Sequence, residues 1–257
     1  MPVLRLRQTM RRISALVPDQ WKRHLKTALF EAPDTEASLR RMQRLGFNPA
    51  VVIDVGAYII DVGAYIGEWA RDLKRIFPSA RMLMVEPQPG HLDRLRAVAA
   101  AFNDVELAPV LLGAQERGSV PFHMCESASS VLMESARPTV VSTISVPMTT
   151  LDKFTANTVF ARPDFIKLDV QGYELEVLRG GELALASAEA VLMEVNLLGI
   201  LDGAPLFHEA TQFMSERGFQ VYDICTFFRR PYDGALWQVD VIFVRGSSPL
   251  VASKCWA

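Results

Sequence analysis

The sequence predicts an α/β fold, a mostly parallel and doubly wound sheet that ends in an antiparallel hairpin. Three observations predict it. In residues 51–69, VVIDVGAYIIDVGAYIGEW, an apolar run of strand formers reaches an acidic residue and a glycine-bearing turn, and then enters a helix-forming segment. Strand-sized apolar runs and helical patterns alternate from there to residue 217. Residues 219–228 and Leu236–Arg245 are both strand-like and are joined by a Pro-Tyr-Asp-Gly turn without a helix, so they should pair antiparallel.

Apolar spacing and turn residues place the remaining elements. A helix is expected over residues 35–45, with Asp34 or Thr35 as its N-cap and Gly46 at its end. Thr150 is available to cap a short helical turn. The other expected helices are residues 68–77, 90–102, 151–154, 174–180 and 207–217, and the other expected strands are the run that opens at Val51 and residues 81–85, 105–112, 119–124, 145–150, 164–170 and 190–195.

The heptapeptide IDVGAYI occurs twice in tandem, at residues 53–59 and 60–66. A shift of seven places puts each repeated residue on the opposite face of a straight strand, so the two copies cannot play the same part in one strand. Only the second copy continues into a glycine and a helix start, with Asp61, Gly63 and Gly67 in the pattern D-x-G-x-x-x-G. The sequence therefore favours the second copy as the working loop. The first copy is then an insertion that bulges out or lengthens the entry to the strand.

Composition indicates a globular chain with room for one large α/β domain or two small ones. Of its 257 residues, 50% are hydrophobic and 22% are charged. The longest apolar runs are strand-sized and fall well short of the roughly 20 residues that span a bilayer, so we expect no stable membrane insertion. Arginines interrupt the apolar start of the chain, and Cys125, Cys225 and Cys255 are widely spaced. A reducing cytoplasm is the expected compartment.

Charge is unevenly distributed. Residues 1–30 hold seven basic residues against Asp19 alone, a net charge of +6, so that the rest of the chain carries −8 of the total of −2. We expect residues 1–34 to be a basic helical leader, which either packs as a solvated helix or contacts an acidic membrane surface peripherally. The acidic body, without an aromatic and basic stripe, gives no indication of nucleic-acid binding.

Glu86 stands at the predicted tip of the second strand, 19 positions after Gly67. At that distance a carboxylate in a βαβ unit receives the two hydroxyls of a nucleotide ribose. An ionised acid suits this task because it accepts hydrogen bonds from both hydroxyls at once. A strand-end charge without a ligand is the alternative interpretation, and the combination of glycine loop and spacing favours ligand contact.

Several motifs together resemble the FkbM family of S-adenosylmethionine-dependent methyltransferases. They are DVGAYIGEW, VEPQP, VPMTTLDKF, FIKLDVQGYELEVLRGG, LMEVN and VDVIFV, and the resemblance runs from about residue 35 to residue 245. It implies a class I, Rossmann-like methyltransferase fold over residues 35–246, a three-layer sandwich whose seven-stranded sheet has a reversed final strand, followed by a tail at 247–257. It also implies a small acceptor, such as a hydroxylated metabolite, sugar, polyketide or glycan precursor, usually methylated on oxygen.

The resemblance assigns roles to individual residues. It places Asp169, with Gln171 and Gly172, at the fourth-strand tip that faces the transferred methyl group. Tyr65 stands where many relatives have Asn or Gly, and Gln171 often corresponds to Glu. The residues expected to bind S-adenosylmethionine are Asp61, Gly63, Ala64, Gly67, Glu86 and Gly113.

Methyl transfer to a hydroxyl needs alignment and a group that takes the proton. Asp169 is the first candidate for this base or hydroxyl orienter, and Glu194, at the next strand tip, is the second. Glu174 begins a helix, so helix capping competes with a catalytic role. His123 and His208 are more typical of surface or capping histidines, and no metal is expected because no ligand motif accompanies the acids.

Two other functions remain open from the sequence. An NAD-dependent oxidoreductase of Rossmann type fits the glycine loop and Glu86, although the antiparallel hairpin argues against it. A catalytically impaired S-adenosylmethionine-binding module is suggested by the duplicated loop. The acceptor pocket is expected among the irregular segments at residues 125–137 and 196–207, with the basic leader as a further candidate for its lining.

Overall fold

The computed structural model describes residues 34–56, 68–124, 129–132 and 142–255. The chain divides into two compact units, Met1–Asp34 and Thr35–Ala257. Nearly all of the first unit lies outside the described residues, so the basic helical leader stays a prediction. The second unit contains every helix and strand of the described residues.

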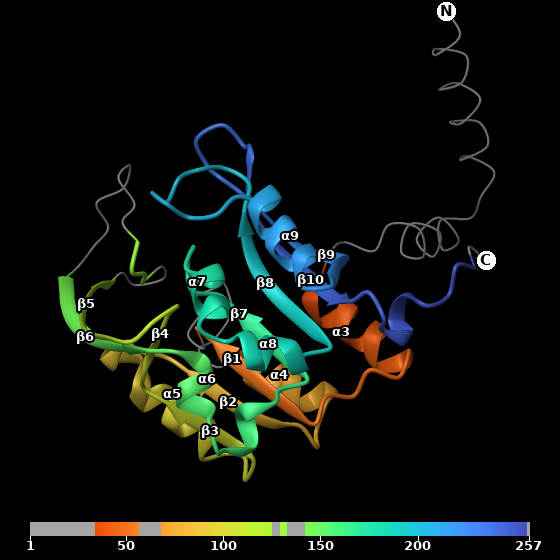
Figure 1. The fold of residues 1–257 in the computed structure, drawn as a ribbon, viewed down its shortest axis with the longest axis horizontal. Helices are drawn as coiled ribbons and strands as arrows, with labels where there is room; N and C mark the ends of the chain where they lie inside the picture. The colour runs from red at the N-terminus through yellow and green to blue at the C-terminus, as the bar shows by residue number, and fades with distance from the viewer. Residues whose placement is uncertain (1–33, 57–67, 125–128, 133–141, 256–257) are drawn as a thin grey trace, which may run out of the picture. The chain divides into compact units, whose positions relative to one another are not determined.

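A seven-stranded sheet forms the centre of this unit, in the order β3-β2-β1-β7-β8-β10-β9 (Figure 1). The pairs β1–β2, β2–β3, β1–β7 and β7–β8 are parallel, and β10 is antiparallel to both β8 and β9. The predicted mostly parallel sheet with an antiparallel C-terminal hairpin is confirmed. The strands are β1 (Val51–Val55), β2 (Arg81–Val85), β3 (Val105–Ala108), β7 (Phe165–Leu168), β8 (Ala190–Asn196), β9 (Phe219–Arg229) and β10 (Leu236–Arg245).

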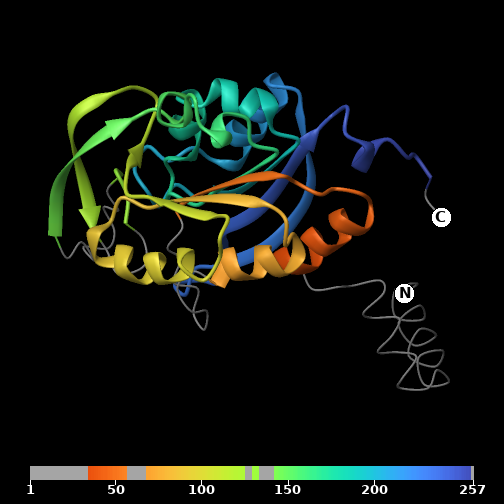
Figure 2. The ribbon, with the colours of Figure 1, turned by 90° about the horizontal axis from the view of Figure 1, so that it is seen from below.

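Helices cover both faces of the sheet and make a three-layer sandwich (Figure 2). On one face lie α3 (Thr35–Arg44), α4 (Glu68–Ile76) and α5 (Leu92–Ala99), which pack on apolar residues such as Val52, Phe165 and Leu192. On the other face lie α6 (Leu151–Thr155), α7 (Glu174–Arg179), α8 (Glu182–Ser187) and α9 (Phe207–Glu216). Because side chains alternate along a strand, a strand buried on both faces is apolar nearly throughout.

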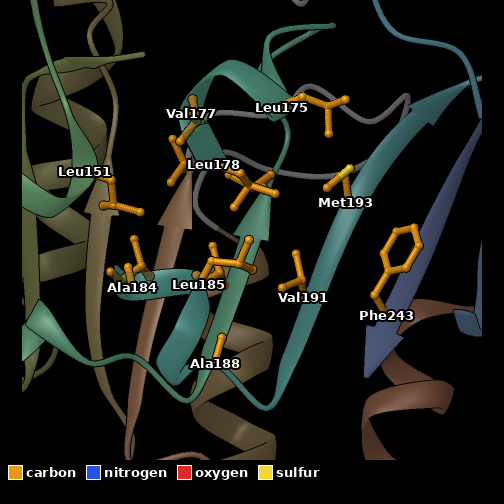
Figure 3. Packing of buried hydrophobic residues seen from close by; sticks show 14 of the residues in the cluster. Leu151, Leu175, Val177, Leu178, Ala184, Leu185, Ala188, Val191, Met193 and Phe243 are labelled. Carbon is orange, nitrogen blue, oxygen red and sulfur yellow. The ribbon is translucent and has the colours of Figure 1, made fainter. Parts of the chain in front are cut away.

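Figure 3 shows from close by the apolar core between the sheet and the helices α6, α7, α8 and α9. Val191 and Met193 of β8 lie beside Leu178 of α7 and Leu185 of α8, and Phe243 of β10 belongs to the same cluster. Thr150 caps α6 as predicted, because its side chain accepts a hydrogen bond of 3.2 Å from the Lys153 amide. The burial of this cluster holds α7 against the sheet, and α7 begins directly after the turn that succeeds β7.

A second, three-stranded sheet has the order β4-β6-β5, with β4 (Leu111–Leu112), β5 (Arg117–Met124) and β6 (Ser142–Thr149). The predicted single strand over residues 105–112 is wrong, because it is divided between the two sheets. Pro109 lacks the N–H that would continue the ladder, and the Val110 amide turns back to the carbonyl of Ala108 at 3.0 Å. The turn carries the chain from β3 in the central sheet to β4 in the small one.

Strand β1 is built from the first copy of the repeat. Ile53, Asp54 and Val55 pair with β2 on one side and with β7 on the other. The expectation that the first copy bulges out or merely lengthens the entry to the strand is therefore wrong for these residues. The second copy, at 60–66, lies outside the described residues. Since the two copies are identical, local propensity cannot distinguish them, and the pairing partners decide.

Candidate functional site

A pocket lies where the strands β1, β2 and β7 end, and its empty space, with the open solvent at its mouth included, is about 670 Å³. Open α/β sheets bind their ligands at this carboxyl edge. Glu86 and Asp169 both line it, although they are far apart in the sequence. The described residues that line the pocket are Val55, Gly56, Val85, Glu86, Pro87, Gln88, His91, Val110, Leu111, Leu112, Phe122, Ser129, Ser130, Val131, Asp169, Val170, Gln171, Tyr173 and Val177.

Gly56 forms the floor of the pocket at the tip of β1. Its φ of 79° is one that side chains rarely adopt, and a Cβ atom there would overlap the carbonyl oxygen of Asp169. Its amide donates to the carbonyl of Val85 at 3.0 Å, and the Asp169 amide donates to the carbonyl of Val55 at 3.0 Å. The position therefore requires glycine, and the first copy of the repeat supplies it. This is the position that the sequence had assigned to Gly63.

The predicted loop residues Asp61, Gly63, Ala64 and Gly67 lie outside the described residues. Their assignment to the cofactor stays a prediction. Asp54 and Gly56 stand in the first copy where Asp61 and Gly63 stand in the second.

A buried ion pair lies beneath the tips of β1 and β7. The Lys167 ammonium is 3.1 Å from Oδ1 of Asp54, donates to the Gly56 carbonyl at 3.2 Å, and stands 5.4 Å from the centre of the Trp69 ring. Burial lowers the pKa of Lys167, but the charges of Asp54 and Asp169 outweigh it and hold this pKa above its usual value. Lys167 therefore stays charged and compensates the buried acids.

Glu86 is 5% exposed at the end of β2, where the sequence placed it. Its Oε1 accepts a hydrogen bond of 2.8 Å from the backbone N–H of Gln88, which orients the carboxylate at the pocket wall. His91, also buried, lines the same wall, and burial followed by the charge of Arg94 lowers the pKa of His91 to about 4. The sequence analysis missed Gln88 and His91, whose only signal was that they come closely after the strand-end acid.

The turn after β7 is fixed by Glu174. Its Oε1 accepts hydrogen bonds from the amides of Val170 at 3.0 Å and Gly172 at 3.1 Å. Burial raises the pKa of Glu174 to about 7 against the opposing effect of the backbone hydrogen bonds. Glu174 does not appear among the described residues that line the pocket, and its carboxylate binds amides of the turn before α7, whose N-cap, Tyr173, makes no side-chain capping hydrogen bond.

Asp169 and Glu194 are joined by a glutamine. Nε2 of Gln171 donates to Oδ1 of Asp169 at 3.0 Å and to Oε1 of Glu194 at 2.9 Å. Asp169 lines the pocket, whereas Glu194 is absent from the described lining and is 8% exposed. Burial, followed by the charges of Asp169, Glu174 and Asp240, raises the pKa of Glu194 well above its usual value. The two predicted catalytic acids thus lie in one cluster, and only Asp169 reaches the pocket.

Gly113 lies apart from this cluster. It is absent from the described lining, and its Cα packs against the Met148 side chain while its carbonyl fills the space beside Gly180. These close approaches explain why glycine stands at positions 113 and 180. The structure therefore does not bring Gly113 to the pocket with Glu86 and Asp169.

The two histidines considered from sequence lie elsewhere. His123 is half-buried on β5, where Nδ1 contacts the Thr143 hydroxyl at 2.9 Å, and His208 is exposed on α9. Within the described residues, no group of three His, Cys, Asp or Glu side chains is arranged to hold a metal ion. No helix in the described part of the chain has the length and apolarity to cross a membrane.

The seven-stranded sheet with its reversed last strand defines a class I methyltransferase fold. Residues 61–221 match the methyltransferase FkbM domain, and because this is more than half of the chain, the chain belongs to that family. The prediction of an FkbM-type, S-adenosylmethionine-dependent methyltransferase is confirmed, and the alternative of an NAD-dependent oxidoreductase is set aside. The match begins at Asp61, inside the second copy of the repeat.

Solved structures with a similar fold are distant in sequence. Magnesium protoporphyrin IX methyltransferase from Synechocystis PCC 6803, determined with bound SAM, is 13% identical, with a TM-score of 0.47 over 82% of this chain and 76% of that one. The N-methyltransferase NodS from Bradyrhizobium japonicum WM9 is 10% identical, with a TM-score of 0.44 over 82% of this chain and 93% of that one. No functionally curated protein matches the chain by sequence.

Proposed function

We propose that the enzyme methylates a hydroxyl group of a small acceptor, a hydroxylated metabolite or a glycan precursor, with S-adenosylmethionine as the methyl donor. The observation that carries this proposal is the meeting of Glu86 and Asp169 on one pocket, with the glycine at the tip of β1 between their strands. Glu86 then binds the ribose of the donor, and Asp169 lies at the end of the pocket where the methyl group is transferred.

The residues present fit the donor. The Glu86 carboxylate is buried at a strand tip, where it can accept hydrogen bonds from both ribose hydroxyls. Gly56 lines the pocket without a side chain, so that a ligand can lie against its bare backbone. The neutral imidazole of His91 and the side chain of Gln88 extend the same wall. Asp61, Gly63, Ala64 and Gly67 are proposed to continue this donor site.

S-adenosylmethionine supplies a methyl group on a sulfonium, which an acceptor oxygen attacks in line. Asp169 is proposed to orient the acceptor hydroxyl and to take its proton as the oxygen–carbon bond forms and the sulfur–carbon bond breaks. A positioned base of this kind typically contributes about 10² to 10⁴-fold in rate. Asp169 suits the task because it lines the pocket with its side chain 11% exposed, while the Lys167 ammonium lies 3.9 Å from its Oδ2. Glu194 is proposed to support this group from behind.

The acceptor is proposed to enter beside Ser129, Ser130 and Val131, which line the pocket next to Gln171. Phe122 and Leu111 make this side apolar. The acceptor site would therefore combine an apolar wall with the polar tip of β7. We propose the cytoplasm as the compartment, and contact of the basic leader with an acidic surface remains part of the proposal.

The experiment has two arms. Calorimetry with S-adenosylmethionine, S-adenosylhomocysteine and NAD tests donor binding, and we expect heat from the first two and none from NAD. A screen of hydroxylated metabolites for methyl incorporation from labelled S-adenosylmethionine then tests transfer. Asp169→Asn should reduce transfer by about 10²-fold or more while donor affinity stays nearly unchanged. An effect of Asp169→Asn on donor affinity alone would contradict the assigned role.

A second candidate is a module that binds S-adenosylmethionine without turnover. It is favoured by the tandem repeat, which adds seven residues between the tip of β1 and α4. Two results together would favour this candidate. The full chain would bind the donor without transferring a methyl group to any acceptor, and a variant that lacks seven residues of the repeat would transfer it.

A further inference from the structure

Gln171 has a backbone conformation that few residues adopt. Its φ is 56°, in the left-handed region, and Gly172 comes next with a φ of 90°. Residues other than glycine are strained in this backbone conformation by about 1–2 kcal/mol, so the surrounding contacts must hold the turn in place. They are the Ser130 hydroxyl, which donates to the Gln171 carbonyl at 2.9 Å, and the Glu174 carboxylate beneath the turn. This strained turn delivers the Gln171 side chain to the two acids.

The Gln171 amide uses both of its hydrogens on carboxylates. A primary amide nitrogen carries two donors, and here one reaches Asp169 and the other reaches Glu194. The orientation of the amide is set by its partners, because its oxygen could not face two carboxylates favourably. Two acids therefore share one neutral donor, which holds each of them in a fixed direction.

The arrangement continues into the sheet behind Glu194. Oε1 of Glu194 also accepts a hydrogen bond of 2.8 Å from Nε2 of Gln238, which in turn donates to Oδ1 of Asn196 at 3.1 Å. Gln238 and Asn196 are 3% and 2% exposed. Glu194 is therefore anchored by two amides, and a rigid row of hydrogen bonds runs from β10 and β8 to the pocket.

We propose that Gln171 is a positioning residue of this methyltransferase, whose side-chain amide aims the Asp169 carboxylate into the pocket and ties it to the buried Glu194. This inference rests on the proposed function, because Asp169 is the acid to be positioned. Glu194 then acts on the reaction through Gln171 and does not touch the acceptor. A glutamate at position 171 could not replace the amide, because an ionised carboxylate donates no hydrogen bond.

The charged groups around Asp169 determine how it responds to changes at Gln171. Lys167 lies beside it on β7, Asp54 faces it from β1, Glu194 from β8 and Glu174 from α7, and Asp240 on β10 faces Lys167 and Glu194. Lys167 is the one cation among these six side chains. Removal of a donor favours the protonated form of a carboxyl, and removal of a neighbouring negative charge favours the ionised form. Because burial holds the pKa of Glu194 well above its usual value, Glu194 is largely protonated in the acid range, so Gln171→Met should act more strongly than Glu194→Gln.

The test monitors the carboxyl ¹³C resonance of Asp169, assigned by its absence in Asp169→Asn, through a pH titration. Gln171→Met keeps the length and the backbone strain but removes both donors, and we expect the titration midpoint to rise by about one pH unit. Glu194→Gln keeps the oxygen that accepts from Gln171, and because the raised pKa of Glu194 leaves it largely protonated in the acid range, this variant should change the midpoint less than Gln171→Met does. Gln212→Met is the matched control on α9, where the Gln212 amide donates to the exposed Glu216, and it should leave the midpoint unchanged.

A larger rise in Gln171→Met than in Glu194→Gln supports the proposal, and a midpoint that Gln171→Met leaves unchanged overturns it. If Gln171→Met does not fold, Gln171→Asn replaces it, because asparagine tolerates the left-handed conformation while its shorter amide cannot reach both carboxylates. Once an acceptor is known, the acidic limb of the pH–rate profile should shift in the same directions with little change in the donor's KM. Calorimetry of S-adenosylhomocysteine binding to the wild type keeps the two proposals apart, because absence of binding contradicts the proposed function whatever the titration shows.

Discussion

Lys167 and Asp54 form an ion pair under the pocket, with Nζ and Oδ1 3.1 Å apart and side chains 5% and 1% exposed. The pair links β1 to β7 at the point where the register places these two residues opposite each other. It also places Lys167, the one positively charged side chain described among these acids, beneath the tips of both strands. The stability of the site and its electrostatics therefore depend on one side chain.

Removal of Lys167 should destabilise the fold strongly. Lys167→Met leaves the buried Asp54 carboxylate without a partner, and we expect a loss of about 3–5 kcal/mol in the free energy of unfolding, measured by urea denaturation at pH 7. Lys153→Met is the matched control, since Lys153 pairs with Glu116 at 2.6 Å on the surface and should contribute about 1 kcal/mol or less. Equal effects of the two variants would contradict the structural role of Lys167.

A side chain at Gly56 should damage both the fold and donor binding. Gly56→Ala adds a Cβ that overlaps the Asp169 carbonyl, in a backbone conformation that alanine already disfavours. Gly203→Ala controls for the disfavoured backbone conformation, because Gly203 has a similar φ of 80° but open space around it. We expect Gly56→Ala to lose about 2 kcal/mol more than Gly203→Ala and to bind S-adenosylhomocysteine more weakly by calorimetry. A chain that tolerates both changes equally would show that the tip of β1 is not closely packed on β7.

Stability should fall as the pH rises from about 4.5 to about 7 because of Glu174. Burial raises the pKa of Glu174 to about 7 in the folded state, above its ordinary value of 4.5. The folded state therefore binds the proton more tightly than the unfolded state, and the stabilisation present at low pH is lost as the carboxyl ionises. At pH values above 7 the loss amounts to about 3 kcal/mol.

Glu174→Gln removes this contribution while it keeps an oxygen for the amides of Val170 and Gly172. Urea unfolding at pH 5 and pH 8 should therefore show a smaller loss of stability in the variant than in the wild type. The pKa of Glu194 is raised as well, so the variant should keep part of the pH dependence. A pH dependence as steep in the variant as in the wild type would rule out Glu174 as its source.

Deletion of one copy of the repeat should preserve the fold. Removal of residues 53–59 or of residues 60–66 produces the same chain, because the copies are identical, and both leave VVIDVG for β1 and its tip. The connection between Gly56 and Glu68 shortens from eleven residues to four. Since halving a loop changes its closure entropy by only about 0.6 kcal/mol, the free energy of unfolding should change by about 1 kcal/mol or less.

Donor binding by the deletion variant tests what the repeat does to the site. We expect S-adenosylmethionine to bind at least as tightly as to the full chain, because in the variant the strand residues VVI run directly into DVGAYIGEW, so that one glycine serves both the tip of β1 and the loop motif. Weaker binding would mean that the extra residues contribute to the donor site. Circular dichroism and a cooperative urea transition serve as controls that the variant is folded.

The sequence alone determined the class of fold and two sides of the pocket. The alternation of strand and helix patterns, the turn between the last two strands and the FkbM motifs predicted the sheet and its hairpin. Glu86 was identified from its place at a predicted strand tip and its distance from the glycine loop, and Asp169 from the family resemblance, which places it at the fourth-strand tip. The two meet because parallel strands of one sheet end at the same edge. The division of residues 105–112 at Pro109 was visible in principle, through the missing N–H of proline.

Tertiary structure decided what local pattern could not. The two copies of IDVGAYI have the same propensities, and only pairing with β2 and β7, with the Asp54–Lys167 contact between them, placed the first copy in β1. The bridge from Asp169 through Gln171 to Glu194 joins Gln171 to a position 23 residues away through a left-handed turn. Hydrogen bonds of this kind depend on the direction of side chains from neighbouring strands, and that direction is defined only when the sheet has formed.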